Sequence, residues 1–240
     1  MTKILLFGYG KMGKMLEDVI NASEDCEYMG SIDIDQLADL PYMGKTADVI
    51  IDFSHPNMLA PLCEYAKRTE TALVSGTTGY TADDMQKLKA LAETVPVLYS
   101  SNYSLGIAIM KMVLAKMHEL IPDDFDIELI ETHHNKKIDA PSGTAKSLLA
   151  ILDEGEEHKK VYGREGMCGA REKGSIGVHA IRGGTVAGEH TVAFYGNNEV
   201  LELTHKAESR RVFAEGAVSA SKKLKDMNSG FYTLEDIIKA

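Results

Sequence analysis

A glycine-rich turn between a predicted strand and a predicted helix constrains the fold of this chain more than any other feature. Residues 3–7 form a continuous apolar run, typical of a strand covered on both faces of a parallel sheet. Gly8, Gly10 and Gly13 follow at once as G-x-G-x-x-G, and residues 14–22 carry apolar side chains at helical spacing. Such glycines let the backbone turn tightly and approach a diphosphate at the N-terminus of the helix. The arrangement predicts a dinucleotide-binding unit.

An acidic residue at a suitable distance strengthens this prediction. Asp33 ends a second predicted strand and lies about 20 residues after Gly13, where a carboxylate can bind a ribose 2′-hydroxyl. A plain glycine turn, the alternative, would leave Asp33 without a role. The carboxylate disfavours a 2′-phosphate and no arginine follows it, which favours NADH, while Lys11 in the turn leaves NADPH open.

Further strands and helices alternate up to about residue 100, which predicts a doubly wound parallel sheet of the Rossmann type. Strands are expected over 27–33, 48–53, 71–75 and 96–100, and helices over 57–67 and 83–93. Ligands of such sheets bind beyond the carboxyl ends of the strands, so the residues after the last two strands are cofactor-binding candidates, although simple turns are an alternative. These candidates are Gly76, Thr77, Thr78, Ser100, Ser101, Asn102 and Tyr103.

The pattern changes after about residue 102 to that of a second, α+β domain with an open mixed sheet. We predict helices over 105–120 and 142–152, a strand over 127–131, and an exposed charged excursion over 155–174. From residue 177 we expect antiparallel strands over 178–181, 189–195 and 200–205, with turns at 183–184 and 196–198. A closing helix over 211–223 follows. The predicted domains are 1–103, completed by 211–240, and 104–210.

The densest cluster of reactive side chains lies within residues 131–145. It contains His133, His134 and Lys137, followed by Ser142, which can cap a helix whose first amides would bind a carboxylate. A histidine can donate a proton near neutral pH. Adjacent strand histidines point to opposite faces and no cysteine lies nearby, so we predict no metal site. An exposed basic loop is the plainer alternative.

The overall composition excludes several classes of partner. The 240 residues include 26 Lys and Arg against 36 Asp and Glu, a net charge of −10, which argues against binding nucleic acid or an anionic membrane. The three cysteines are scattered, with no C-x-x-C pair, and no secretory or membrane-spanning segment is recognisable, so we expect a cytoplasmic protein. The basic residues near His133 would supply a local positive site for a small anionic substrate.

The stretch 131–145 closely resembles the signature of the 4-hydroxy-tetrahydrodipicolinate reductase (dihydrodipicolinate reductase) family. The resemblance covers nearly the whole chain, including the glycine turn and the segments 76–78, 101–104, 181–184, 188–190 and 204–207. It implies that NADH or NADPH delivers a hydride to C4 of a conjugated imine formed by water loss, and that a proton then enters at C3. It also implies a place in lysine and diaminopimelate synthesis and a homotetramer formed through the open sheet.

The resemblance also assigns roles to individual residues. It implies that His133 is the catalytic proton donor, that Lys137 is a second catalytic donor, and that His134, Ser142, Gly143 and Thr144 bind the substrate dicarboxylate. It implies cofactor contacts from Gly8, Tyr9, Gly10, Lys11, Met12, Gly13, Asp33, Gly76, Thr77, Thr78, Ser100, Ser101, Asn102 and Tyr103. The chain departs from common family members by a shorter segment over 36–45 and by lacking a basic residue after Asp33.

Two alternative functions remain at this stage. The first is another NAD(P)-dependent amino-acid or semialdehyde dehydrogenase of the same architecture, against which the 137–144 stretch speaks. The second is a non-catalytic NAD-binding regulator, for which the chain shows no recognition helix. For four more polar residues, a structural role and a position facing the site are both open: Arg182, His190, His205 and Lys206.

Overall fold

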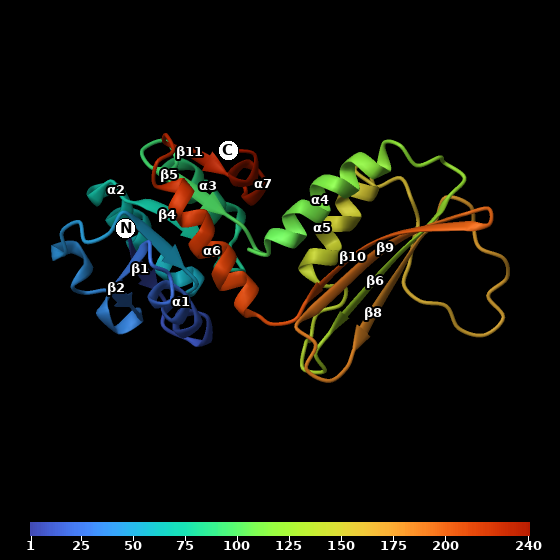
Figure 1. Cartoon of the computed structure of the whole chain (residues 1–240), viewed down its shortest axis with the longest axis horizontal. Coiled ribbons are helices and arrows are strands. Elements are labelled where there is room, and N and C mark those ends of the chain that lie inside the picture. Colours follow the sequence, from blue (N-terminus) through green and yellow to red (C-terminus); the bar gives the residue numbers. More distant parts are fainter. The chain divides into compact units, whose positions relative to one another are not determined.

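The computed structural model describes all 240 residues, which divide into two compact units. Residues 1–105 and 211–240 form the first unit, and residues 106–210 form the second. Each unit has its own sheet (Figure 1). None of the helices is long and apolar enough to span a lipid bilayer.

The first unit contains a six-stranded, all-parallel sheet in the order β11-β5-β4-β3-β1-β2, which confirms the predicted Rossmann-type fold. The strands are β1 (Thr2–Phe7), β2 (Cys26–Ile32), β3 (Val49–Asp52), β4 (Ala72–Ser75), β5 (Pro96–Tyr99) and β11 (Gly230–Tyr232). Strand β2 lies on one side of β1, and β3, β4, β5 and β11 follow on the other side. The strand order therefore reverses beside β1, where sheets of this type bind ligands.

Helices cover both faces of this sheet, as the unbroken apolar character of β1, β3 and β4 requires. They are α1 (Lys11–Asn21), α2 (Leu59–Thr69), α3 (Ala82–Leu91), α6 (Arg211–Leu224) and α7 (Leu234–Lys239), with short 3₁₀ turns at Ile34–Gln36, Leu40–Tyr42 and Pro56–Met58. Helix α1 begins at Lys11, earlier than predicted, so the glycine turn itself forms the helix start. The sequence does not predict β11 and α7, because elements this short show no clear hydrophobic periodicity.

The second unit contains a five-stranded mixed sheet in the order β10-β9-β6-β8-β7, which confirms the predicted open mixed sheet. The strands are β6 (Asp126–His133), β7 (Lys160–Val161), β8 (Ile176–Arg182), β9 (Gly188–Gly196) and β10 (Glu199–Ala207). Helices α4 (Leu105–His118) and α5 (Gly143–Leu152) pack on one face, and apolar side chains from both helices and from β6, β8 and β9 form the core there (Figure 1).

The strands expected over 178–181, 189–195 and 200–205 do run in alternating directions, but the expected turn pairing of the first two is wrong. Strand β8 pairs in parallel with β6, and β6 separates β8 from β9. Gly183 and Gly184 therefore do not close a hairpin but begin a connection that crosses β6. A glycine pair fits both kinds of connection, and the choice depends on the distant strand β6. The β9–β10 hairpin is confirmed as antiparallel, with Asn198 at φ 67° in its turn.

Candidate active site

The glycine turn after β1 is shaped by close packing at two of its three glycines. Gly8 has φ +86°, and a Cβ there would lie 2.7 Å from the Phe53 carbonyl oxygen. A Cβ on Gly13 would lie 2.3 Å from the Gly8 carbonyl oxygen. At Gly10 a Cβ would meet nothing within 4 Å, and this residue begins α1 without a side-chain cap. The first amides of α1 thus have no side-chain cap, as a site for a diphosphate requires.

Asp33 lies beside this turn, at the end of β2. Its Oδ1 accepts a hydrogen bond from the Ile34 amide at 2.8 Å, and its Oδ2 lies 3.4 Å from the Tyr9 amide nitrogen. The Tyr9 hydroxyl donates to the Glu17 carboxylate, which raises the pKa of Tyr9 to about 12. Lys11 is exposed and Met12 is half-buried. The residues expected to hold the diphosphate and the ribose therefore meet at one edge of the first sheet.

The loops after β3 and β4 are joined by a buried carboxylate that sequence reasoning did not single out. Asp52 is completely buried and accepts hydrogen bonds from the Ser54 amide and hydroxyl (3.1 and 2.5 Å), the Ser75 hydroxyl (2.8 Å) and the Tyr80 hydroxyl (2.9 Å). Thr77 accepts a further bond from the Ser54 amide at 2.9 Å. The available signal was an acid at the end of an otherwise apolar strand.

The other cofactor candidates differ in accessibility. A Cβ on Gly76 would lie 2.4 Å from the Phe53 ring, so this loop also depends on a glycine, while Thr78 is exposed. Ser101 is exposed, and Ser100 donates to the Asn102 carbonyl oxygen at 2.7 Å. Tyr103 is buried, and its hydroxyl donates to the Ser75 carbonyl oxygen at 2.8 Å. Its side chain therefore belongs to the core of the first unit.

In the second unit, Glu131 lies at the centre of a hydrogen-bonded network. Its carboxylate is completely buried on β6 and lies 2.5 Å from Nδ1 of His133, two residues further along the same face. Both terminal nitrogens of Arg182 donate to it at 2.8 Å, and the Ser142 amide donates at 3.1 Å. Burial alone would raise the pKa of Glu131, but the bonds from Arg182, His133 and Ser142 lower it below its usual value. The carboxylate is therefore anionic at neutral pH.

A second histidine packs against His133. The two rings meet edge to face, with centroids 5.2 Å apart, and Nε2 of His190 lies 3.1 Å from Oγ of Ser142. Burial and the neighbouring His133 lower the pKa of His190 to about 4, so the ring is neutral at pH 7. Ser142 also accepts a bond from the Ala145 amide at 3.1 Å, which confirms its predicted role as the cap of α5.

Cationic side chains lie at the end of β6. Nζ of Lys137 is 2.7 Å from Oδ1 of Asp139, and Nη2 of Arg210 is 2.8 Å from Nε2 of His134. Partial desolvation and the charge of Arg210 lower the pKa of His134. Sequence reasoning missed Arg210, because nothing in the local sequence links it to a residue 76 positions away.

The start of α5 completes this group. Gly143 is exposed, a Cβ on it would meet nothing within 4 Å, and Thr144 is half-buried. All six residues that the resemblance assigns to catalysis and substrate binding thus lie in the second unit, whereas all the cofactor candidates lie in the first.

Of the four polar residues whose roles the sequence left open, two lie in the Glu131 network and two lie outside it. Arg182 and His190 belong to the Glu131 network. His205 stands opposite His190 in the β9–β10 register, and burial lowers its pKa. Lys206 forms an exposed ion pair with Glu189 at 3.7 Å, on the rim of the sheet.

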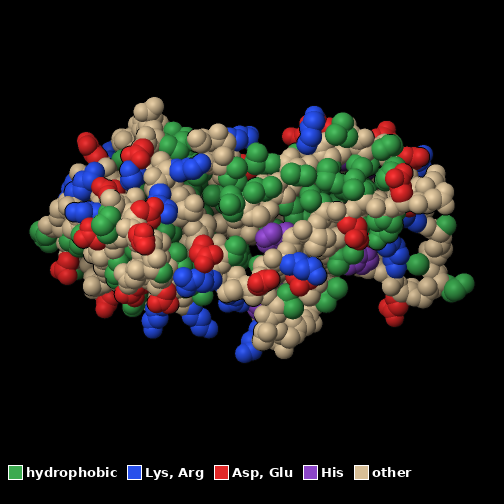
Figure 2. Space-filling model, viewed as in Figure 1, with side chains coloured by type: hydrophobic (Ala, Val, Ile, Leu, Met, Phe, Trp, Pro, Cys, Tyr) green, Lys and Arg blue, Asp and Glu red, His purple; other side chains and the backbone are tan.

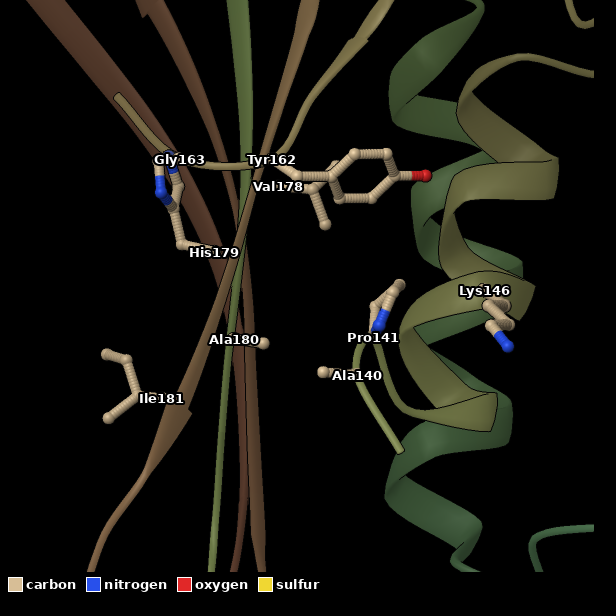
Figure 3. Close-up of a pocket in the computed structure, with 9 residues that line it drawn as sticks. All are labelled: Ala140, Pro141, Lys146, Tyr162, Gly163, Val178, His179, Ala180 and Ile181. Carbon is tan, nitrogen blue, oxygen red and sulfur yellow. The ribbon is translucent and has the colours of Figure 1, made fainter. Parts of the chain in front are cut away.

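A cavity of about 680 Å³ lies at the outer edge of β8, where β7 pairs with only its first residues. Figure 3 shows Tyr162 above Ala140 and Pro141, between β8 and α5. Its lining contains none of the predicted site residues.

Comparison with known proteins identifies the family of both units. The family model of the dihydrodipicolinate reductase N-terminus matches residues 2–103, and the model of its C-terminus matches residues 106–238. The 4-hydroxy-tetrahydrodipicolinate reductase of Clostridium novyi is 40% identical over 251 residues, covering 100% of this chain and 99% of that protein. The enzyme of the same name from Staphylococcus aureus strain JH9 is 40% identical over 98% of this chain and 100% of that protein.

Solved structures agree in fold. The dipicolinate-bound dihydrodipicolinate reductase from Paenisporosarcina sp. TG-14 superposes with a TM-score of 0.79 over 99% of both chains, at 22% identity. The diaminopimelate dehydrogenase of Corynebacterium glutamicum is more distant, with a TM-score of 0.59 and 14% identity over 98% of this chain and 93% of that chain. The expected activity class, an NAD(P)H-dependent oxidoreductase, is confirmed by the sequence matches. Because family models match almost every residue and relatives near 40% identity match from end to end, the chain belongs to the dihydrodipicolinate reductase family.

Proposed function

We propose that this chain reduces 4-hydroxy-tetrahydrodipicolinate, after loss of water, to tetrahydrodipicolinate, as a step of lysine and diaminopimelate biosynthesis. One observation carries the proposal: an imidazole held by a buried carboxylate lies within the same unit as Lys137, His134, Arg210 and the open start of α5. This combination supplies a proton donor and several groups that bind carboxylates.

The first unit fits a dinucleotide cofactor. The amides at the start of α1 would hold the diphosphate, Asp33 would accept a bond from a ribose hydroxyl, and Thr78 and Ser101 are exposed near the strand ends for the nicotinamide side. When bound, NADH or NADPH supplies the hydride. The carboxylate of Asp33 favours NADH, and the exposed Lys11 is the available contact for the 2′-phosphate of NADPH.

The second unit would bind the two carboxylates of the substrate. The amides of Gly143 and Thr144 at the first positions of α5 suit one of them, and the cationic groups of Lys137 and Arg210 suit the other. These contacts orient the ring relative to His133, which lowers the entropic cost of reaction. His133 then donates a proton to the ring carbon that carries the developing negative charge.

A steady-state assay on freshly prepared 4-hydroxy-tetrahydrodipicolinate tests this function with both cofactors. We expect substrate-dependent oxidation of NADH and NADPH, with NADH at least as effective, and no turnover of amino acids or semialdehydes. Tight cofactor binding without turnover would favour the regulator instead. His133→Gln should lower kcat by about 10²–10⁴-fold with little change in KM. A wild-type kcat in this variant would reject His133 as the proton donor.

We also infer that four copies assemble, in the cytoplasm. Large apolar side chains are exposed on the second sheet, including Ile181, Val200 and Leu201, and others gather over α4 on the face shown in Figure 2. Exposed apolar surface of this kind commonly marks an interface. All three cysteines are free, which suits a reducing compartment. Light scattering after size exclusion should give the mass of a tetramer, and a monomer would contradict the inference.

A further inference from the structure

Four hydrogen-bonding groups surround the Glu131 carboxylate, two at each oxygen. Oε1 accepts from Nη2 of Arg182 at 2.8 Å and from the Ser142 amide at 3.1 Å. Oε2 accepts from Nη1 of Arg182 at 2.8 Å and faces Nδ1 of His133 at 2.5 Å. An ionised carboxylate can only accept, so Nδ1 of His133 must carry a hydrogen in this arrangement.

We propose that Glu131 is a positioning residue that fixes the Nδ1–H tautomer of His133 and thereby makes Nε2 the nitrogen that exchanges the catalytic proton. The catalytic consequence rests on the function proposed above, but the tautomer itself does not. In the reaction, the imidazolium loses the proton on Nε2 to the substrate carbon, and a neutral ring with Nδ1–H remains. A proton from solvent then restores Nε2–H before the next turnover.

The surroundings of Nε2 support this assignment. A Cβ on Gly188 would lie 3.1 Å from Nε2 of His133, so the absence of a side chain at the start of β9 leaves room at this atom. The neighbouring His190 ring is neutral at pH 7, its pKa being about 4, and it places no charge against the imidazolium. His133 is therefore held at Nδ1, and residue 188 places no side chain against Nε2.

The partners of the carboxylate are themselves fixed by the sheet. His133 and Arg182 are register partners on the parallel strands β6 and β8, so the guanidinium reaches Glu131 from the adjacent strand. Nη2 of Arg182 also donates to the Asp139 carbonyl oxygen at 2.5 Å. Since Arg182 and the Ser142 amide can only donate, neither can accept a bond from a residue in place of Glu131.

This asymmetry predicts what Glu131→Gln does to His133. An amide NH₂ at the Oε1 position would face two donors, Arg182 and the Ser142 amide. At the Oε2 position it would face only one fixed donor, because Nδ1 of His133 can become an acceptor by moving its hydrogen to Nε2. The substitution should therefore switch the neutral ring to the Nε2–H tautomer, and the ring could become the donating imidazolium only by placing an Nδ1–H against the amide NH₂.

The test is ¹⁵N NMR of the histidine side chains of the full-length protein at a pH where His133 is neutral. The His133 signals are identified by their absence in His133→Gln. We expect Nδ1–H in the wild type and in Arg182→Gln, which retains the carboxylate, and Nε2–H in Glu131→Gln. We expect kcat of Glu131→Gln to fall by about 10²–10⁴-fold with KM nearly unchanged, as for other orienting carboxylates, and Glu131→Asp to recover part of it.

The chain offers a matched control on the same strand. Glu128 is also bound by arginine and histidine side chains, with Nη2 of Arg164 at 2.9 Å and Nε2 of His179 at 2.6 Å, but it lies on the other face of β6. Glu128→Gln should keep the His133 tautomer and kcat within about twofold.

The outcomes separate the two proposals. Retention of Nδ1–H in Glu131→Gln would overturn the positioning role, as would a wild-type kcat in a tautomer-switched variant. If Glu131→Gln does not fold, an Nε2–H tautomer in the wild type or in Glu131→Asp would overturn it equally. A wild-type protein with Nδ1–H but no turnover would instead reject the proposed reaction, because the NMR result does not depend on activity.

Discussion

Each unit of the molecule contains one completely buried carboxylate near the end of a strand, and the two are stabilised in different ways. Asp52 in the first unit accepts four hydrogen bonds, three from hydroxyls and one from an amide. Glu131 in the second unit also accepts four, but two come from the guanidinium of Arg182 and one from His133. The neutral donors to Asp52 connect the loops after β3 and β4, whereas Arg182 and Glu131 together hold the imidazole of His133.

The two sites differ in whether their hydrogen-bond donors can also act as acceptors. A hydroxyl can rotate and accept a bond, while a guanidinium or a backbone amide can only donate. Burial and the nearby Asp52 raise the pKa of Tyr80, so its hydroxyl keeps its proton and remains a donor to Asp52. The Asp52 cluster can thus adapt to an amide in place of the carboxylate through its hydroxyls, whereas the Glu131 network can adapt only at His133, by a change of tautomer.

The largest expected effect on stability is a direct test of this difference. Glu131→Gln should lower the free energy of unfolding by about 3 kcal/mol, because it leaves Arg182 partly uncompensated in a buried site. Asp52→Asn should cost only about 1 kcal/mol, because Ser75 and Tyr80 can turn to accept from the new amide. Urea unfolding followed by circular dichroism measures both. Equal losses would mean that the reversibility of the donors does not matter.

The next effect concerns charge outside the network. Lys137→Ala should reduce kcat/KM by about 10²-fold, affecting both kcat and KM, because it removes a cation that would hold a substrate carboxylate. Lys136→Ala is the matched control, since its side chain is exposed and forms no ion pair with a neighbouring acid, and it should change kcat/KM by less than about twofold. Equal effects would indicate general attraction of an anion rather than a specific contact.

These two regions also show what could be predicted from the sequence. The glycine turn and the cap of α5 depend on a few consecutive residues, so Gly8–Gly13 and Ser142 could be recognised directly. Glu131 shares a face of β6 with Ile127 and Leu129, whereas Glu128 lies on the other face, but the local sequence does not show which side chain pairs with a carboxylate at that buried position. Its role depends on Arg182, 51 residues away, and on the parallel pairing of β8 with β6, which the sequence did not predict.

The same reasoning explains the other differences. Arg210 contacts His134 only because β10 returns to the end of β6, so its position depends on the completed sheet. Tyr103 stands among exposed polar residues in the sequence, yet its ring fills the core of the first unit. Contacts between residues close in sequence could be predicted, and contacts created by the strand order could not.

In the first unit, substitutions in the glycine turn should act through shape rather than through charge. Gly13→Ala should destabilise the fold by about 1–3 kcal/mol, because its Cβ would lie 2.3 Å from a backbone oxygen. Gly10→Ala should leave the melting temperature nearly unchanged, because its Cβ meets nothing within 4 Å, yet weaken NADH binding by entering the space of the diphosphate. Calorimetry and fluorescence titration separate the two. A destabilised Gly10→Ala would show that the open space is structural.

The last effect depends on pH and comes from the neutral ring of His190 beside the charged network, and its sign follows from proton linkage. His190 has a pKa of about 4 in the folded protein against 6.5 for an ordinary histidine, so between these values the unfolded chain binds a proton that the folded chain does not. Folding stability should therefore fall as the pH drops from 6.5 toward 4, by at most about 1.4 kcal/mol per pH unit from this group.

His190→Gln isolates this contribution, because glutamine keeps a polar group near Ser142 but does not titrate. The difference in unfolding free energy between wild type and variant should shrink steadily from pH 7 to pH 4, as the wild type alone loses the stability linked to a neutral ring. A constant difference across this range would mean that folding does not lower the pKa of His190. His190 would then gain a charge in mildly acidic solution while packed edge to face on His133, and the proposed environment of Nε2 would be wrong.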